Sequence, residues 1–152
     1  MIHQRIYIED YGNWLVDIYY GVTHFEVDEI MENLYDIGCD SMSARRAYDN
    51  ITSGDLNTGL TYSNYANKQS IIVIGVSENR EQFFNSLVHE FLHLTAHIST
   101  VFKLDMYSES VCYLIGNISQ LAYKVASKFF CKCTHCKDKV IRNITAKHHS
   151  NM

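Results

Sequence analysis

The clearest chemical motif of this chain is the run His89-Glu90-Phe91-Leu92-His93. On an α-helix, residues four apart lie one above the other on the same face, so the imidazoles of His89 and His93 can converge on one metal ion. This spacing predicts a zinc clamp with Zn–N distances of about 2.0 to 2.1 Å. Glu90 stands beside the clamp and supplies the carboxylate that can take a proton from a zinc-bound water and pass it to a leaving group. The motif therefore predicts zinc-assisted hydrolysis.

A catalytic zinc takes three protein ligands and leaves one position for water, so the motif needs a third ligand. His97 continues the histidine series, but on a straight helix it lies about 12 Å from His89, too far for one helix to supply all three ligands. Glu109 follows His93 by sixteen residues, and an antiparallel return of the next helix would bring its carboxylate back to the pair. We therefore predict His89, His93 and Glu109 as metal ligands, Zn2+ as the cofactor and Glu90 as the general base.

Two long helices must position these residues. The first is predicted from about residue 78 to residue 99, with Ser77 as its N-cap. The second begins at Glu109 and carries apolar residues at helical spacing as far as Phe129. The predicted buried stripe of the first helix consists of Phe84, Leu87, Val88, Phe91, Leu92 and Thr95.

The residues before the motif alternate between strand and helix patterns. Runs of β-branched and aromatic residues predict strands, and the first two runs flank the turn residues Asp10 to Asn13, which predicts a hairpin. Apolar residues spaced by three and four predict helices, the first of them ended by Gly38. The predicted elements are strands over 2–8, 14–20, 60–62 and 71–76, and helices over 27–37 and 43–51.

These elements predict an α+β fold, in which a small, mostly antiparallel sheet of about three or four strands packs on the two long helices. A chain of 152 residues suits one domain. We assign that domain to residues 1–130 and treat residues 131–152 as a polar tail rich in Cys, His and Lys.

Composition and charge exclude several classes of protein. With 47% hydrophobic and 20% charged residues the chain is not of the disordered type, and a net charge of -4 gives no attraction for nucleic acid. The sequence has no apolar run of membrane-spanning length, and its first residues lack the basic-then-apolar pattern of a secretory signal peptide. We therefore expect no membrane partner and a cytoplasmic location. The oligomeric state stays open.

The stretches LVHEFLHLTAHIS and YSESVCYLIG resemble compact zincin-like proteins of the gluzincin type, a family of zinc metallopeptidases found in phages and gut bacteria. The resemblance covers about residues 70 to 125. It implies a zincin-like core, peptidase activity on a peptide or protein substrate, and the zinc and base roles already given to His89, His93, Glu109 and Glu90.

The resemblance also implies a substrate-binding strand. In the family, the strand just before the HExxH helix lines the cleft, so Gln69 to Val76 would pair with an extended peptide as an added edge strand. The substrate-binding residues implied in this way are Ile72, Val73 and Ile74.

Two features depart from the larger gluzincins. The position four after Glu109, where those enzymes often have an aspartate that supports a zinc histidine, is Tyr113. No motif marks the residue that would stabilise the tetrahedral oxyanion, and Tyr62, Tyr65 and Tyr107 are the candidate donors.

Two alternatives remain open at this point. One is a zincin-scaffold protein that binds a partner without catalysis. The other is a zinc-stabilised adaptor, in which Cys131, Cys133 and Cys136 hold a structural zinc together with His148 or His149.

Overall fold

A computed structural model of the protein describes residues 1–130, and the predicted tail over 131–152 lies outside the described residues. Its centre is a four-stranded sheet in the order β1-β2-β4-β3. The predicted hairpin is confirmed: β1 (Ile2–Ile8) pairs antiparallel with β2 (Trp14–Val22). β2 pairs in parallel with β4 (Gln69–Gly75), and β4 pairs antiparallel with β3 (Gly59–Asn64). In the described sheet, β1 and β3 are therefore the two edge strands.

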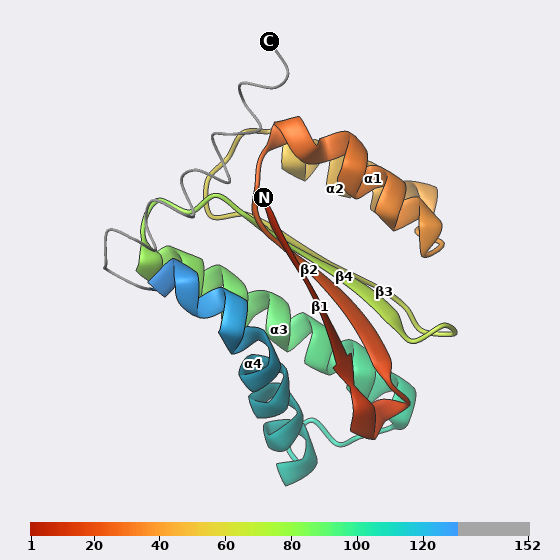
Figure 1. Cartoon of the computed structure of the whole chain (residues 1–152). Coiled ribbons are helices and arrows are strands. Elements are labelled where there is room, and N and C mark those ends of the chain that lie inside the picture. The colour runs from red at the N-terminus through yellow and green to blue at the C-terminus, as the bar shows by residue number, and fades with distance from the viewer. Residues whose placement is uncertain (131–152) are drawn as a thin grey trace.

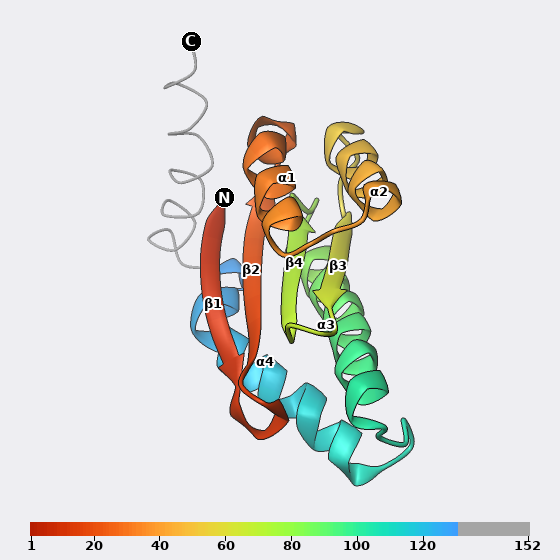
Figure 2. The same cartoon turned by 90° about the vertical axis from the view of Figure 1, so that its right-hand side faces the viewer.

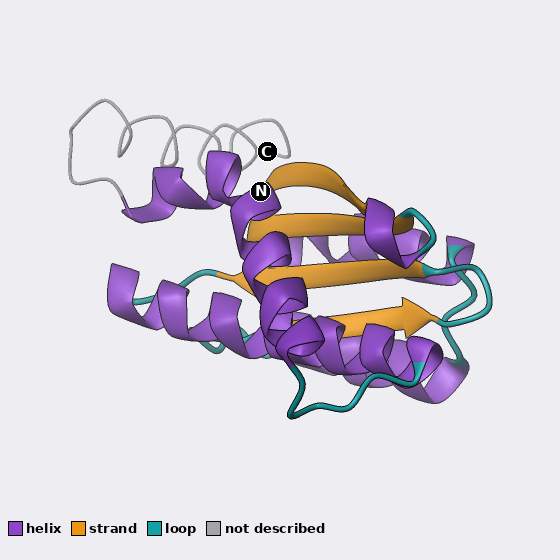
Figure 3. Ribbon diagram, turned by 90° about the horizontal axis from the view of Figure 1, so that it is seen from below, coloured by secondary structure: helices purple, strands orange, loops and turns teal. Residues whose placement is uncertain are grey.

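Helices cover both faces of this sheet (Figures 1 and 3). α1 (Val27–Asp36) and α2 (Ser41–Thr52) lie on one face, and α3 (Arg80–Phe102) and α4 (Glu109–Phe130) lie on the other. The described residues also form two short 3-10 helices, Glu9–Tyr11 and His24–Glu26. The predicted α+β class is thus confirmed, with a mixed sheet in which two of the three strand pairings are antiparallel.

Two hydrophobic cores lie on opposite faces of the sheet. β4 contributes to both, because successive side chains of a strand point to opposite faces. The core against α3 and α4 includes Trp14, Ile18, Ile72, Ile74, Leu87, Phe91, Leu94 and Ile118. The core against α1 and α2 includes Tyr19, Ile71, Val73, Ile30, Leu34, Ala47 and Ile51. Burial on both faces explains why residues 71–74 read as a continuous apolar run.

Specific residues mark the end of α1 and the start of α2. α1 is followed by Gly38, whose φ of 82° is the left-handed conformation that favours glycine, as the sequence predicts. α2 is capped by Asp40, whose carboxylate accepts a hydrogen bond of 2.9 Å from the backbone N–H of Ser43. In Figure 2, α1 lies over β2 and α2 lies over β3. Edge strand β3 is therefore flanked by α3 on one face and α2 on the other.

None of the helices within residues 1–130 combines the length and the hydropathy that a membrane-spanning helix needs.

Candidate zinc site

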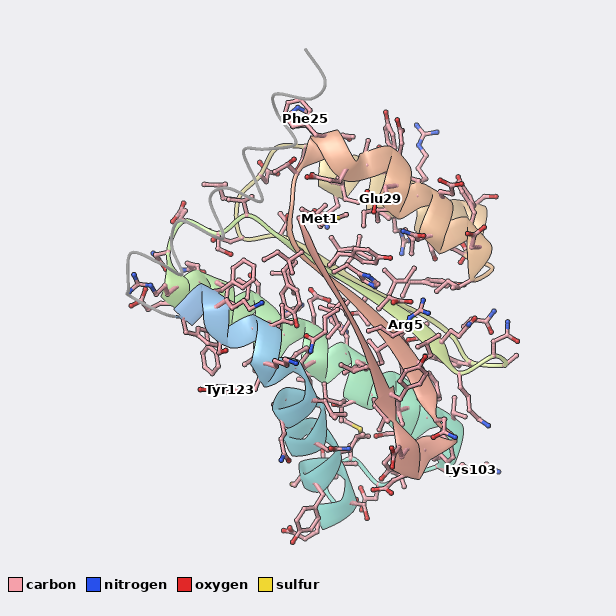
Figure 4. All side chains as sticks on the ribbon, in the orientation of Figure 1. Met1, Arg5, Phe25, Glu29, Lys103 and Tyr123 are labelled. Atoms are coloured by element: carbon pink, nitrogen blue, oxygen red, sulfur yellow. The ribbon has the colours of Figure 1, made fainter. Side chains whose placement is uncertain are left out.

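Helix α3 carries the HExxH motif and has a well-defined start. Asn79, rather than the predicted Ser77, is the N-cap, and its side chain accepts a 2.8 Å hydrogen bond from the backbone N–H of Gln82. At the other end, Lys103 adopts a left-handed φ of 54° and stops the helix (Figure 4). The helix therefore extends to Phe102, three residues beyond its predicted end.

The buried face of α3 differs in part from the prediction. Leu87, Phe91 and Thr95 are buried as expected, but Phe84, Val88 and Leu92 are 55%, 43% and 52% exposed. The helix is apolar on nearly every side in this region, so periodicity alone does not fix its rotation. The inward positions are Phe83, Ser86, Leu87, Glu90, Phe91, Leu94, Thr95, Ile98 and Ser99. This rotation leaves both motif histidines on the solvent side and turns Glu90 inward.

His89 and His93 converge as the spacing predicts. Their Nε2 atoms lie 3.1 Å apart, and their ring centroids lie 4.8 Å apart. Two imidazole nitrogens on one tetrahedral zinc, each at about 2.05 Å, are separated by roughly 3.3 Å. The observed separation is close to this value, and both side chains are exposed to solvent. The two imidazoles can therefore occupy two positions of a zinc ion without rearrangement of the helix.

Glu90 is buried between α3 and β3. Its side chain is 4% exposed, and its Oε2 accepts a 2.7 Å hydrogen bond from the hydroxyl of Thr61. A Cβ atom at Gly59 would lie 2.7 Å from Oε1 of Glu90, so glycine leaves the space that the carboxylate occupies. On edge strand β3, Thr61 thus binds the carboxylate of the predicted general base and Gly59 leaves room for it.

The substitution Thr61→Val tests this arrangement through stability. Valine keeps the shape of threonine but removes the donor, which leaves a buried carboxylate oxygen without its partner. We expect the free energy of unfolding, measured in urea, to fall by about 1 to 3 kcal/mol. Thr100→Val, which removes an exposed hydroxyl on α3, is the matched control and should lower the free energy of unfolding much less. Equal losses in the two variants would show that the Thr61 hydroxyl does not support Glu90.

His97 belongs to a chain of hydrogen bonds that the sequence did not reveal. The indole N–H of Trp14 donates to Ser70 Oγ at 2.8 Å, Ser70 Oγ lies 2.7 Å from Ser63 Oγ, and Ser63 Oγ lies 2.8 Å from Nδ1 of His97. The indole can only donate, so we expect Ser70 to donate onward to Ser63 and Ser63 to donate to Nδ1, which gives each hydroxyl one donated and one accepted hydrogen bond. Burial lowers the pKa of His97, and the nearby His93 lowers it further. Both effects favour the neutral imidazole, and a hydrogen bond from Ser63 to Nδ1 predicts the tautomer with its proton on Nε2.

This tautomer can be measured without any activity assay. Long-range proton–nitrogen NMR spectra should show His97 protonated at Nε2 at pH 7. Ser63→Ala removes the hydroxyl that selects this form, and a larger share of the Nδ1–H tautomer is expected in that variant. A wild-type His97 protonated at Nδ1 would contradict the direction of the chain.

Glu109 is not brought to the histidine pair. It is the first residue of α4 and is exposed, whereas α3 continues nine residues past His93, about 13 Å along its axis, before the chain turns. No other Asp or Glu occurs in α4, so an antiparallel return places no carboxylate level with His93. Among residues 1–130, no three His, Cys, Asp or Glu side chains are grouped so that they could hold one metal ion.

The implied substrate residues Ile72, Val73 and Ile74 lie in β4, which is the interior strand between β2 and β3. All three are buried, and β4 is paired on both sides. A peptide therefore cannot add to β4 as an edge strand, and this part of the expectation is corrected. The edge strand in contact with α3 is β3, through Thr61 and Glu90.

The candidate tyrosine donors lie in different surroundings. Tyr62 donates its hydroxyl to the carbonyl of Gly38 at 3.1 Å, and Tyr107 is 97% exposed. Tyr65 packs beside His97, with ring centroids 5.6 Å apart. Of the three, Tyr65 is the one in ring contact with the histidine series of α3.

Comparison with known proteins leaves the chain without a match: no protein-family model, curated protein or solved structure is similar enough to it to be identified as a relative.

Proposed function

We propose that the chain is a zinc-dependent hydrolase, most specifically a peptidase, with His89 and His93 as zinc ligands and Glu90 as general base. The observation that carries the proposal is the convergence of the two Nε2 atoms to 3.1 Å on the same helix turn that carries the buried Glu90. Coordination needs a further protein donor, which residues 1–130 do not supply in this arrangement. Cys131, Cys133, His135 and Cys136 are zinc-binding residue types in the remainder of the chain.

The chemistry divides between the metal and the protein. Zinc, when bound, polarises a substrate carbonyl and lowers the pKa of a coordinated water to about 7. Glu90 takes the proton of the attacking water on its carboxylate and then gives it to the departing amine. Thr61 holds one oxygen of that carboxylate in place, and Gly59 leaves room for the other.

The position of β3 favours a peptide as the substrate. One side of β3 pairs with β4, and within the described sheet no strand pairs with its other side. An extended peptide can add to such an edge through main-chain hydrogen bonds, about 4.8 Å from β3. Thr61 of β3 contacts Glu90, so an added strand would pass next to the proposed base.

An open hollow beside His89 adds a second surface for substrate. It has a volume of about 450 Å³ and is lined by Phe84, Val88 and His89, together with Glu81 and Asn85. Exposed apolar side chains next to a polar centre are typical of binding surfaces. In the proposed enzyme the hollow, which borders His89, and the free edge of β3 in the described sheet, which borders Glu90 through Thr61, would both contact the substrate.

The test is cleavage of an unstructured polypeptide by the full-length protein, followed by mass spectrometry. Metal-free protein should be inactive, and one equivalent of zinc should restore cleavage. The double variant His89→Ala/His93→Ala is the control for contaminating proteases. Zinc-loaded protein that cleaves no faster than this variant would overturn the proposed activity.

The non-catalytic scaffold is the second candidate, and it is favoured by the finding that residues 1–130 bring together a pair of histidines but no third His, Cys, Asp or Glu that could hold the same metal ion. It predicts that zinc-loaded wild type leaves every polypeptide intact. The adaptor alternative involves Cys131, Cys133 and Cys136, which lie outside the described residues. Replacement of these three cysteines by serine should leave cleavage unchanged if they serve only such an adaptor.

A further inference from the structure

A second hollow lies on the other face of edge strand β3, where α2 covers it. It has a volume of about 240 Å³. Leu34, Cys39 and Ala47 are buried and provide apolar surface at its base. The remaining lining residues are Ser43, Arg46 and Asn50 of α2 and Leu60, Thr61 and Tyr62 of β3. Thr61 therefore connects this hollow with the Glu90 side of the strand.

Arg46 is the charged residue of this lining. Its guanidinium makes a weak hydrogen bond, 3.8 Å from Nη2 to the Sδ of Met42. The ion pairs of residues 1–130 join Met1 to Glu26 and Arg5 to Asp17, with His3 also in contact with Asp17, and none involves Arg46. Arg5, by contrast, makes two hydrogen bonds of 2.9 and 3.0 Å to Asp17. The Arg46 guanidinium thus has no carboxylate partner within the described part of the chain.

The other polar groups around Arg46 have partners of their own. Asn50 donates to the carbonyl of Gly59 at 3.0 Å, and Tyr62 donates to the carbonyl of Gly38. Asp40 caps α2 through Ser43, and the hydrogen bonds from Ser43 lower the pKa of its carboxyl. Asp49 lies one turn along α2 and forms no ion pair with Arg46. The hollow is therefore apolar at its base and positively charged at its side.

We propose that this hollow is a subsite for an acidic side chain, Asp or Glu, of a peptide that lies along β3. The inference rests on the proposed function, because it uses the same edge strand for the substrate. Side chains of an added strand alternate between the two faces of the sheet. One residue then lies on the Glu90 side of the sheet, and its neighbour enters the hollow, where a carboxylate forms charge-assisted hydrogen bonds with Arg46.

The geometry of β3 places the two sites at the same level. Thr61 contacts Glu90 on one face, while Leu60 and Tyr62 on either side of it line the hollow on the other face. Neighbouring residues of a strand are about 3.3 Å apart along its axis. The acidic residue is therefore expected next to the scissile bond, at a position adjacent to the residue that faces Glu90.

The experiment uses full-length, zinc-loaded protein and a peptide series that differs at one position, with Glu, Gln or Lys. We expect kcat/KM for the Glu peptide to exceed that for the Gln peptide by about tenfold. Arg46→Glu should reverse the order and favour Lys. Arg45→Glu changes a neighbouring exposed arginine that does not line the hollow, and it should keep the wild-type preference.

A binding measurement tests the acidic subsite independently of the proposed peptidase activity. Fluorescence anisotropy with the Glu90→Gln variant reports peptide affinity without turnover, and the Glu peptide should bind about tenfold more tightly than the Gln peptide. Equal affinity for the two peptides, or a preference unchanged by Arg46→Glu, would overturn the acidic subsite even if cleavage occurs. Selective binding without any cleavage would support the subsite and reject the peptidase.

Discussion

Glu90→Gln is expected to abolish peptide cleavage while it preserves zinc binding. Glutamine is nearly isosteric and can still contact Thr61, but it cannot accept the proton of the attacking water. Removal of a general base typically costs 10² to 10⁴ in rate, so we expect kcat to fall by about 10³. Initial rates on one peptide, together with zinc content, provide the measurement.

The control is Glu81→Gln, which makes the same chemical change at an exposed position in the first turn of α3. It should retain both zinc and full activity. A Glu90→Gln variant with wild-type kcat would remove Glu90 from the mechanism, and the buried carboxylate would then serve only to join α3 to β3.

Gly59→Ala is expected to reduce cleavage by about 10², because a misplacement of about 1 Å at a catalytic group has an effect of this size. The new methyl group would lie 2.7 Å from Oε1 of Glu90, closer than carbon and oxygen atoms can approach. The carboxylate must therefore move, while His89 and His93 are not disturbed. We expect kcat to fall and zinc content to stay the same.

Gly116→Ala is the matched control, since a Cβ at this exposed position of α4 would meet no atom within 4 Å. It should leave activity intact and increase stability by about 0.5 to 1 kcal/mol, because alanine is the better helix former. If Gly59→Ala had the activity of Gly116→Ala, the close approach of β3 to Glu90 would have no part in catalysis.

Local patterns in the sequence predicted most of the elements but not the order of the strands. The hairpin of β1 and β2 follows from two β-branched runs around a turn, and the helical position of His89 and His93 follows from their spacing. Whether β4 or β3 forms an edge depends on pairing between distant segments, which periodicity does not encode. The continuous apolar run of β4 was nevertheless a signal of burial on both faces.

The sequence predicts the part of the candidate site that one helical turn determines. It does not predict the part that depends on the length of α3. The histidine pair needs one turn of helix, whereas the position of Glu109 depends on where α3 ends and α4 begins. Since α3 runs to Phe102, Glu109 stands beyond the far end of that helix. Gly59 and Thr61 lie about thirty positions before Glu90, and their small, alternating side chains on β3 were the available signal.

Zinc content by elemental analysis, measured side by side for wild type, His93→Ala and Glu109→Ala, tests the central claim most directly. The serine variant of Cys131, Cys133 and Cys136 shows how much zinc the C-terminal cysteines carry. The account predicts that His93→Ala loses the zinc bound at the histidine pair, whereas Glu109→Ala keeps it. Full zinc content in His93→Ala would contradict the account, because the pair on α3 would then not be a metal site.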